Sequence, residues 1–425
     1  MITNKLTTMS AFLPESDSED ELPPGWEERA TLGGAVYYAN HALASTQWSH
    51  PRTGKRKTVS DNLPFGWDRK ILENNKVLYV DLLNKKTTYT DPRLAFAKET
   101  SAPGTPFRQK HDASTTALQV LHGRDLSGKV AVVTGASSGI GFQVARALAC
   151  HGCCVVMACR DQVQAEVAMD KIKTERPHAK CDWLHLDLAS METVRSFVMR
   201  FSLLHSSLDY LVLNAGVYTQ THSVTKDGWE TMMQVNYLAQ FYLTNLLHKH
   251  LLSAPSPRVV TLTSESHRFS LTNLSSPPSP LQFSPTPSQF TPVLQHNDSK
   301  LFCLLFSKSL HTKFHRVGLC SLAVHPGNLV PTNLYRHSLF FSIMSTICRP
   351  FTKSPAQAAG SVIFALCGEE PQLSSFSHCY INNCFPSLPS EEGRSEELGE
   401  MVWDMTVREM EAKLGDKWYL WKQWE

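Results

Sequence analysis

The sequence VAVVTGASSGIG at Val130–Gly141 predicts a buried parallel strand, a glycine turn and the start of a helix. An apolar, β-branched run ends at Thr134, and the amphipathic segment Phe142–Ala149 follows the last glycine at once. Glycines let the backbone approach a pyrophosphate closely, and the first helical turn offers it unpaired N–H groups. A glycine turn that binds no ligand would have the same local pattern, so the surrounding segments must distinguish the two. The turn residues assigned to cofactor binding are Thr134, Gly135, Ser137, Ser138, Gly139, Ile140 and Gly141.

Length and composition exclude several classes of protein. The 425 residues exceed one typical domain, and the net charge of +2 provides no electrostatic reason to expect nucleic-acid binding. The N-terminal residues lack the apolar centre of a secretory signal, and no apolar run approaches the ~20 residues of a membrane span. The 11 cysteines are mostly scattered, which fits reduced thiols in the cytosol or nucleus. Cys150 and Cys153 form a single C-x-x-C pattern with no second pair nearby, so we expect no metal site.

Two similar short segments precede the glycine turn. Each opens with Leu-Pro-x-Gly-Trp, continues through an aromatic strand and closes with a proline. Both resemble WW domains, small three-stranded sheets that bind proline-rich peptides. We call residues 22–54 the first WW-like domain and residues 63–95 the second. In each, the opening Trp, the second aromatic of the strand (Tyr38 or Tyr79) and the last Pro are expected to form a small core.

The resemblance implies a peptide-binding site in the first WW-like domain. There, Tyr37 and Trp48 would hold a polyproline-II peptide, and a neighbouring pocket would take the tyrosine of a PPxY ligand. The residues of that pocket are Ala39, His41 and Thr46. The second WW-like domain has Leu78, Leu82 and Tyr89 in place of the groove Tyr, the His and the Trp. We interpret it as a structural companion of the first, and a weak site of its own is the alternative.

The remaining N-terminal segments are interpreted as connections. Residues 1–21 are rich in Ser, Asp and Glu and are expected to be disordered. The basic run Arg52–Lys57 fits either a solvated linker or a nuclear-import signal. Residues 96–124 are expected to tether the WW-like domains to a large α/β domain at 125–415, and residues 416–425 form an aromatic tail.

Strand and helix patterns alternate after the glycine turn, which predicts a Rossmann-type doubly wound parallel sheet. The expected strands are Cys153–Ala158, Trp183–Leu186, Tyr210–Leu213, Arg258–Leu262, Gly318–Val324 and Cys379–Ile381, and the expected helices include Val163–Glu175, Met191–Leu203, Gly228–Leu252, Pro355–Cys367 and Glu396–Leu414. The second strand ends at Arg160 and Asp161, where a dinucleotide site contacts the adenosine ribose. An arginine accommodates the 2′-phosphate of NADP, and an acid favours the 2′-hydroxyl of NAD. Arg160 favours NADP, while Asp161 leaves NAD, or a simple helix cap, open.

Several motifs in this order resemble the short-chain dehydrogenase/reductase family. They are TGASSGIG at the turn, Asp187-Leu188, Asn214-Ala215-Gly216, a serine after the fifth strand and His325-Pro326-Gly327 after the sixth. The resemblance implies that these positions, with Thr332, contact a nicotinamide cofactor. It further implies that Ser264 binds the substrate oxygen, Lys300 the nicotinamide ribose, and Asn236 a water of the proton relay. The resemblance of both parts to known families implies an adaptor-oxidoreductase that, by family analogy, would act in apoptotic, stress and transcriptional signalling in the cytoplasm and nucleus, with mitochondria as a further location.

The family's catalytic tyrosine is missing from its expected place. That position, four residues before Lys300, is His296, and no tyrosine lies within Leu243–Leu334. Histidine transfers protons, but its ring is shorter than a phenol and the Lys300 charge favours its neutral form. We therefore predict either a working NAD(P)-dependent enzyme through His296 or a cofactor-binding domain with impaired catalysis, and favour the second for this position.

Two further segments bear on the substrate. Residues 271–292, rich in Ser and Pro, are expected to be a disordered loop, with a lid over the substrate pocket as the alternative. The apolar segment Leu339–Ile347, with Leu334 and Tyr335 nearby, fits a lipid-like, steroid-like or retinoid-like substrate, or equally the packing of a core helix.

Overall fold

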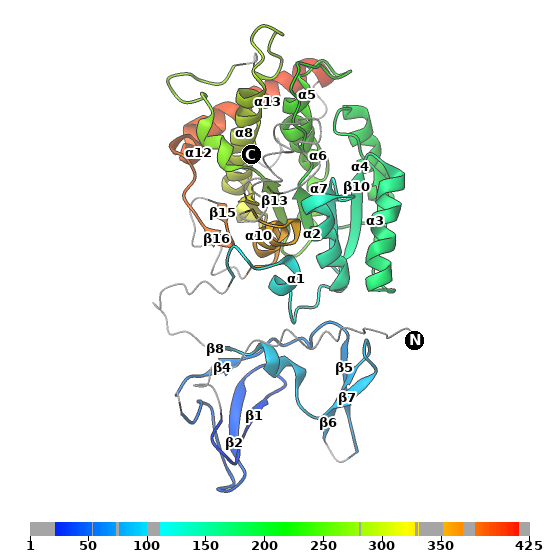
Figure 1. Cartoon of the computed structure of the whole chain (residues 1–425), viewed down its shortest axis with the longest axis vertical. Coiled ribbons are helices and arrows are strands. Elements are labelled where there is room, and N and C mark those ends of the chain that lie inside the picture. Colours follow the sequence, from blue (N-terminus) through cyan, green and yellow to red (C-terminus); the bar gives the residue numbers. More distant parts are fainter. Residues whose placement is uncertain are drawn as a thin grey trace, which may run out of the picture. The chain divides into compact units, whose positions relative to one another are not determined.

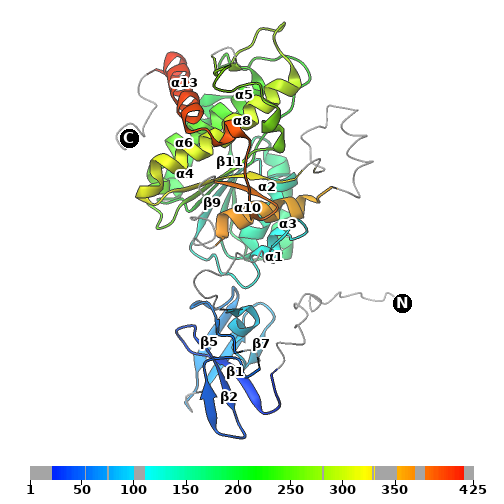
Figure 2. The ribbon, with the colours of Figure 1, turned by 90° about the vertical axis from the view of Figure 1, so that its left-hand side faces the viewer.

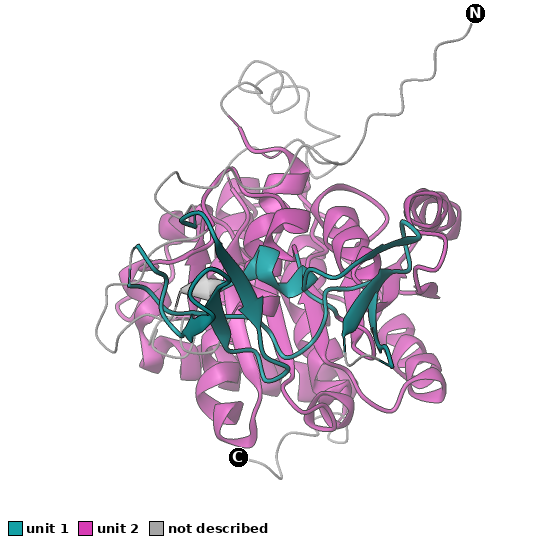
Figure 3. Cartoon of the chain, turned by 90° about the horizontal axis from the view of Figure 1, so that it is seen from below, with its two compact units in different colours: residues 1–106, 123–125 teal, residues 107–122, 126–425 magenta. Residues whose placement is uncertain are grey.

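The computed structural model of the chain describes residues 22–52, 54–73, 76–99, 111–279, 282–327, 330, 352–368 and 379–415. They belong to two compact units, which Figure 3 colours separately. Unit 1 comprises residues 1–106 and 123–125, and unit 2 comprises residues 107–122 and 126–425. Among the described helices, none combines the length and apolarity needed to cross a bilayer.

Unit 1 contains two three-stranded antiparallel sheets, which confirms the fold predicted for the WW-like domains. The first sheet consists of β1 (Trp26–Ala30), β2 (Val36–Asn40) and β3 (Ser45–Gln47). The second consists of β5 (Trp67–Ile71), β6 (Val77–Asp81) and β7 (Lys86–Thr88). A third, two-stranded sheet pairs β4 (Lys57–Thr58) with β8 (Lys98–Glu99). This pairing ties the segment between the two WW-like domains to the segment after the second.

Residues at the end of the second WW-like domain complete the core of the first. Helix η2 (Pro92–Phe96) closes the second domain, and two apolar residues, Leu94 and Ala97, pack against the buried side chains of the first. The apolar residues that meet there are Trp26, Val36, Tyr38, Val59, Leu94 and Ala97. The first WW-like domain therefore buries more apolar surface than its own three strands provide, which offsets the marginal stability of so small a sheet.

A buried arginine in η2 makes the polar part of this connection. Arg93 is only 2% exposed and pairs with Asp91 at 2.8 Å. Its guanidinium also donates to the carbonyl oxygens of Thr31 at 2.9 Å and Ser60 at 3.0 Å. Thr31 lies in the loop after β1, so one side chain joins the end of the second WW-like domain to the first.

Unit 2 is a mostly parallel α/β sheet of Rossmann type, as predicted. Its eight strands lie in the order β11-β10-β9-β12-β13-β14-β15-β16, and all neighbours are parallel except the last two. The strands are β9 (Val130–Thr134), β10 (Cys154–Cys159), β11 (Cys181–His185), β12 (Tyr210–Leu213), β13 (Arg258–Leu262), β14 (Cys320–His325), β15 (Tyr380–Asn382) and β16 (Phe385–Pro386). The chain order reverses between β9 and β12. Open α/β sheets bind their ligands at such a switch point, beyond the carboxyl ends of the strands.

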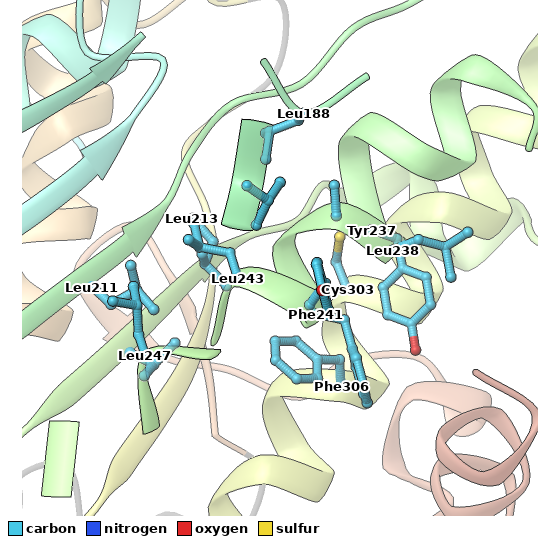
Figure 4. Close-up of a cluster of buried hydrophobic side chains, with 14 of the residues drawn as sticks. Leu188, Leu211, Leu213, Tyr237, Leu238, Phe241, Leu243, Leu247, Cys303 and Phe306 are labelled. Atoms are coloured by element: carbon cyan, nitrogen blue, oxygen red, sulfur yellow. The ribbon is translucent and has the colours of Figure 1, made fainter. Parts of the chain in front are cut away.

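Helices cover both faces of this sheet (Figures 1 and 2). On one face lie α1 (Ala117–Val120), α2 (Gly139–Cys150), α3 (Gln162–Glu175) and α10 (Pro355–Cys367). On the other lie α4 (Met191–Leu204), α5 (Thr231–Met233), α6 (Ala239–Leu246), α7 (His248–Leu252), α8 (Pro292–Phe314) and α13 (Glu396–Leu414), with the short α12 (Glu391–Arg394) before α13. Successive strand residues alternate between the two cores, because Val132 packs with the second group and Val133 with the first. Figure 4 shows part of the second core, where Leu211 and Leu213 of β12 lie in one apolar cluster with Phe241 and Phe306.

Several elements differ in extent from the predicted ones. The predicted helix Gly228–Leu252 is divided into α5, a π-helical turn η3 (Gln234–Leu238), α6 and α7. Helix α8 begins at Pro292, well before Lys300, because proline suits the first turn of a helix. The range 96–124, predicted as a linker, contains β8 and α1, and Leu121 at the end of α1 is fully buried.

The Ser/Pro-rich segment 271–292, predicted as a disordered loop, is mostly exposed or half-buried where it is described, but one aromatic side chain anchors it in the core. Phe283 is fully buried in the core with Tyr237 and Phe302, and its carbonyl accepts from the Glu230 N–H at 2.9 Å. One buried aromatic ring anchors the loop despite its composition.

Candidate functional site

The glycine turn forms a tight cradle at the start of α2. Gly135 and Gly139 have φ values of +66° and +59°, which side chains rarely tolerate. A Cβ on Gly141 would lie 2.5 Å from both the Asn214 side chain and the Gly135 carbonyl oxygen. Ser138 occupies the N-cap position of α2 but makes no side-chain cap hydrogen bond. The turn and helix start therefore have the close packing that backbone recognition of a pyrophosphate requires.

Thr134 joins this turn to the next sequence motif. Its hydroxyl accepts from the backbone N–H groups of Asn214 and Ala215, both at 2.9 Å. The Asn214 side chain donates back to the Thr134 carbonyl at 2.8 Å. Two motifs far apart in the sequence thus lie side by side at the β9/β12 switch point.

The two residues after β10 differ in what they are free to contact. Asp161 caps α3, since its carboxylate accepts from the Gln164 backbone at 3.1 Å and side chain at 3.0 Å. Arg160 is exposed and makes no hydrogen bond or ion pair in the described part of the chain. Asp161 therefore caps helix α3, which was one of the roles left open by the sequence. The Arg160 side chain is available for a ligand.

Asp187 and Leu188 follow β11 at the same edge of the sheet. The Asp187 carboxylate accepts from the Ala189 N–H at 3.0 Å, and its backbone N–H donates to Thr193 at 3.2 Å. Leu188 is buried, and its carbonyl accepts from Gln234 at 3.3 Å. Both residues are held by their own turn and by the π-helical segment.

Two predicted catalytic residues, Asn236 and Lys300, converge with the predicted cofactor contact Gly216. A Cβ on Gly216 would lie 3.3 Å from Oδ1 of Asn236 and 3.8 Å from Nζ of Lys300. Asn236 is fully buried in η3, and such π-helical turns occur frequently at functional sites. Its side chain exchanges hydrogen bonds with both backbone groups of Val217 and donates to Ser299 at 3.2 Å. The structure therefore gives Asn236 a direct bracing contact in addition to the predicted contact with water.

Lys300 is tied to the end of strand β13, close to Ser264. Its ammonium donates to the Leu262 carbonyl at 3.1 Å, and its own carbonyl accepts from the Thr263 hydroxyl at 2.7 Å. Ser264 begins the 3₁₀ turn η4 (Glu265–Phe269), where its hydroxyl accepts from the Ser266 N–H at 3.2 Å. Burial lowers the pKa of Lys300.

His296 is held one helical turn before Lys300 but lies in a setting that disfavours charge. It is 6% exposed, and its Nδ1 is buried without a hydrogen-bond partner. Burial, with a smaller contribution from the Lys300 charge, lowers the pKa of His296 to about 3. At neutral pH the ring is therefore uncharged, and it is both a weak base and a poor acid.

The last predicted cofactor contacts follow β14. Gly327 has a φ of +124°, and a Cβ there would meet the Lys353 side chain at 2.9 Å. Pro326 lies between Gly327 and the buried His325. Thr332, and the apolar segment Leu339–Ile347, lie outside the described residues.

Alternation along β2 builds the groove of the first WW-like domain. Val36 and Tyr38 are buried, which leaves Tyr37 and Ala39 on the opposite face. The ring of Tyr37 meets that of Trp48 edge to face at 5.9 Å, and Trp48 is 54% exposed.

The remaining residues of that groove lie on the same sheet. Ala39 pairs with Thr46 on β3, and the exposed His41 ring contacts the Glu27 carboxylate at 2.7 Å. Of the predicted peptide-binding residues, His41, Thr46 and Trp48 are thus exposed, and Tyr37 and Ala39 are half-buried. In the second WW-like domain, Leu82 and Tyr89 are equally exposed but offer neither an indole nor an imidazole.

Sequence reasoning missed two residues at the catalytic end of the sheet. Tyr218, two residues after Gly216, contacts His296 ring to ring with centroids 5.6 Å apart. Thr263 fixes the backbone of Lys300. Proximity of Tyr218 to the glycine of the Asn-Ala-Gly motif was the one available signal, because residues just after a strand end lie at the ligand edge.

Comparisons with known proteins agree with this architecture. Residues 129–276 match the family model for short chain dehydrogenase, and residues 22–51 match the WW domain model. The chain is 47% identical to the WW domain-containing oxidoreductase of Homo sapiens, over 96% of this chain and 98% of that protein. It is 32% identical to retinol dehydrogenase 12 of Mus musculus, over 69% of this chain and 88% of that protein.

A solved structure supports the fold of unit 2. The crystal structure of an uncharacterized protein from Mycobacterium paratuberculosis has a TM-score of 0.54 and 26% identity, covering 70% of this chain and 98% of its own. The identity to the human WW domain-containing oxidoreductase extends over nearly the full length of both proteins and not over one domain alone. The two proteins therefore share the same order of WW and dehydrogenase parts along the chain. The chain therefore belongs to the family of WW domain-containing oxidoreductases.

Proposed function

We propose that unit 2 is an NADP-dependent oxidoreductase that interconverts a carbonyl and an alcohol on a lipid-like substrate, and that the first WW-like domain recruits partners carrying PPxY. The observation that carries the proposal is the convergence of Gly216, Asn236 and Lys300 beside the glycine cradle at the switch point. Membership in the family supports a nicotinamide cofactor as the ligand of that cradle. When bound, this cofactor would supply or accept a hydride.

The preference for NADP over NAD rests on the residues after β10. Asp161 is engaged as a helix cap, and the exposed Arg160 is free to pair with a 2′-phosphate. Ser264 is proposed to bind the substrate oxygen and Lys300 the nicotinamide ribose. Pro326, Gly327 and Thr332 are proposed to contact the nicotinamide side of the cofactor. NAD remains the alternative, through the 2′-hydroxyl.

The substrate class is supported by the relative that is named a retinol dehydrogenase. A retinoid-like or steroid-like carbonyl compound is therefore proposed. From the family resemblance we further propose a role in apoptotic, stress and transcriptional signalling, in the cytoplasm and nucleus with mitochondria as a further site. In that setting, the WW groove would bring proline-rich proteins to a domain that responds to the cofactor.

A second candidate function is a cofactor-binding scaffold with little turnover. The low pKa of His296 favours it, since a neutral, buried imidazole cannot replace the phenol of an ordinary family member. Both candidates predict cofactor binding, and they differ in whether a carbonyl substrate is reduced.

Calorimetric titration of the full chain with NADPH and NADH tests the cofactor. We expect NADPH to bind more tightly, and Arg160→Ala to weaken NADPH about tenfold by loss of a charge-assisted hydrogen bond while leaving NADH unchanged. Arg200→Ala, on exposed surface of α4, is the matched control. Equal affinities for the two cofactors would contradict the NADP assignment. Oxidation of bound NADPH by a panel of retinoid and steroid carbonyls then separates the enzyme from the scaffold.

A further inference from the structure

A tyrosine from another part of unit 2 lies against the position where the family's tyrosine is missing. The ring of Tyr218 meets the ring of His296 edge to face, with centroids 5.6 Å apart and planes at 72°. Resting on the proposed oxidoreductase function, we propose that Tyr218 is the catalytic proton-transfer residue of unit 2.

The backbone that carries Tyr218 is fixed relative to the other catalytic-site residues. Val217, immediately before it, donates from its N–H to Asn236 at 2.8 Å and accepts at its carbonyl from the same side chain at 3.1 Å. Gly216, one residue earlier, lies against Lys300, since a Cβ there would be 3.8 Å from Nζ. Tyr218 therefore leaves a braced backbone next to the ribose-binding lysine of the proposed site.

The other tyrosines in the described part of unit 2 are unsuited to this role. Tyr237 is buried and hydrogen-bonds Thr406, while Tyr242 accepts from Arg195 at 2.5 Å. Tyr380 donates to Glu265, and Tyr210 is buried within strand β12. All four of these side chains are buried, whereas Tyr218 is only half-buried.

The proton and electron balance of a reduction is complete with Tyr218 as the acid. When bound, a reduced nicotinamide would supply the hydride, with its electron pair, that the carbonyl carbon accepts. The Tyr218 O–H bond would break and its proton would go to the carbonyl oxygen, which gives an alcohol and a phenolate. Water would then reprotonate the phenolate.

The electrostatic setting suits an acid that is charged only during turnover. Burial raises the pKa of Tyr218, so the phenol holds its proton at neutral pH. The positive charge of an oxidised nicotinamide, added to that of Lys300, would favour the phenolate form. His296 is neutral and has no hydroxyl group. The phenol next to it is that of Tyr218.

Carbonyl-dependent NADPH oxidation by the full chain tests the role directly. Tyr218→Phe keeps the ring against His296 and removes only the hydroxyl, so we expect kcat to fall at least about 100-fold. NADPH affinity, measured by calorimetry, should change less than about twofold. Tyr89→Phe, at an exposed tyrosine of unit 1, is the control and should leave kcat unchanged. Full activity in Tyr218→Phe, with loss in His296→Phe, would overturn the proposal and return the role to His296.

A spectroscopic titration tests the role of Tyr218 even if reduction of the retinoid and steroid carbonyls is too slow to measure. Tyrosinate absorbance is followed against pH with and without NADP⁺, in the wild type, in Tyr218→Phe and in Tyr89→Phe, an exposed tyrosine of unit 1. We expect NADP⁺ to lower one tyrosine pKa by about 1 or more, and only Tyr218→Phe to abolish the change. A change that persists in Tyr218→Phe, or no change in the NADP⁺-bound wild type, would overturn it. Absence of NADPH binding to the wild type would instead refute the proposed function itself.

Discussion

Asn236 holds Val217 by both of its backbone groups: Val217 N–H donates to Oδ1 at 2.8 Å, and Nδ2 donates to the Val217 carbonyl at 3.1 Å. This pairing joins η3 to the chain that leaves β12. Because Asn236 is fully buried, water cannot replace these hydrogen bonds if the amide is removed. One asparagine therefore determines where Gly216 and Tyr218 lie.

Substituting this asparagine should cost stability as well as activity. Asn236→Leu leaves both Val217 groups without their partner, at about 1–3 kcal/mol for each buried polar group. We expect the free energy of unfolding of unit 2 to fall by about 2–5 kcal/mol in urea titrations. Gln162→Ala, on exposed surface of α3, is the control and should change it by less than about 0.5 kcal/mol. An unfolding midpoint in Asn236→Leu equal to that of the control would show that the brace contributes nothing.

The groove of the first WW-like domain should account for peptide binding. Tyr37→Ala removes one aromatic wall, and we expect the affinity for a fluorescent PPxY peptide to fall at least about tenfold. The matched control is Leu78→Ala, the corresponding position of β6 in the second WW-like domain, which should leave the affinity unchanged. If Leu78→Ala reduces binding and Tyr37→Ala does not, the peptide binds to the second domain instead.

Arg93 should stabilise a domain to which it does not belong in sequence. Arg93→Met would leave the buried Asp91 carboxylate without its ion pair and remove donors to Thr31 and Ser60, at a cost of about 3–5 kcal/mol. We expect a lower melting temperature for unit 1 and weaker PPxY binding, although Arg93 lies at the end of the second WW-like domain. Arg69→Ala, exposed on β5, is the control. Peptide affinity and melting temperature equal to those of Arg69→Ala would refute the coupling.

Acid should destabilise unit 2 through His296. Burial lowers the folded-state pKa of His296 to about 3, whereas an unfolded histidine titrates near ~6.5. Between these values the unfolded chain binds the extra proton, so the His296 contribution to unfolding free energy falls as pH falls, by about 1.4 kcal/mol per pH unit. His296→Gln removes this dependence. We expect its acid-unfolding midpoint, followed by far-UV circular dichroism, to lie at lower pH than that of the wild type, and an identical midpoint would contradict the burial of a neutral ring.

Local sequence patterns were sufficient for the layout of both units. The apolar β-branched runs, the glycines of the turn and the repeated Trp and Tyr positions each act over a few residues, because strand burial and turn geometry depend on near neighbours in the chain. Strands Tyr210–Leu213 and Arg258–Leu262 and helices Pro355–Cys367 and Glu396–Leu414 have the predicted bounds for this reason. The division of the predicted helix Gly228–Leu252 at η3 was not predictable in this way, since it depends on packing against other elements.

The amino-acid sequence by itself determined the glycine cradle, the aromatic pair Tyr37 and Trp48, and the substitution of His296 for the family's tyrosine. Only the tertiary structure decided that Arg93 completes the first WW-like domain and that Tyr218 lies against His296. The physical reason is the same in both cases. A contact between residues distant in the chain forms only when the sheets and helices that carry them have packed. A local sequence pattern therefore cannot predict it.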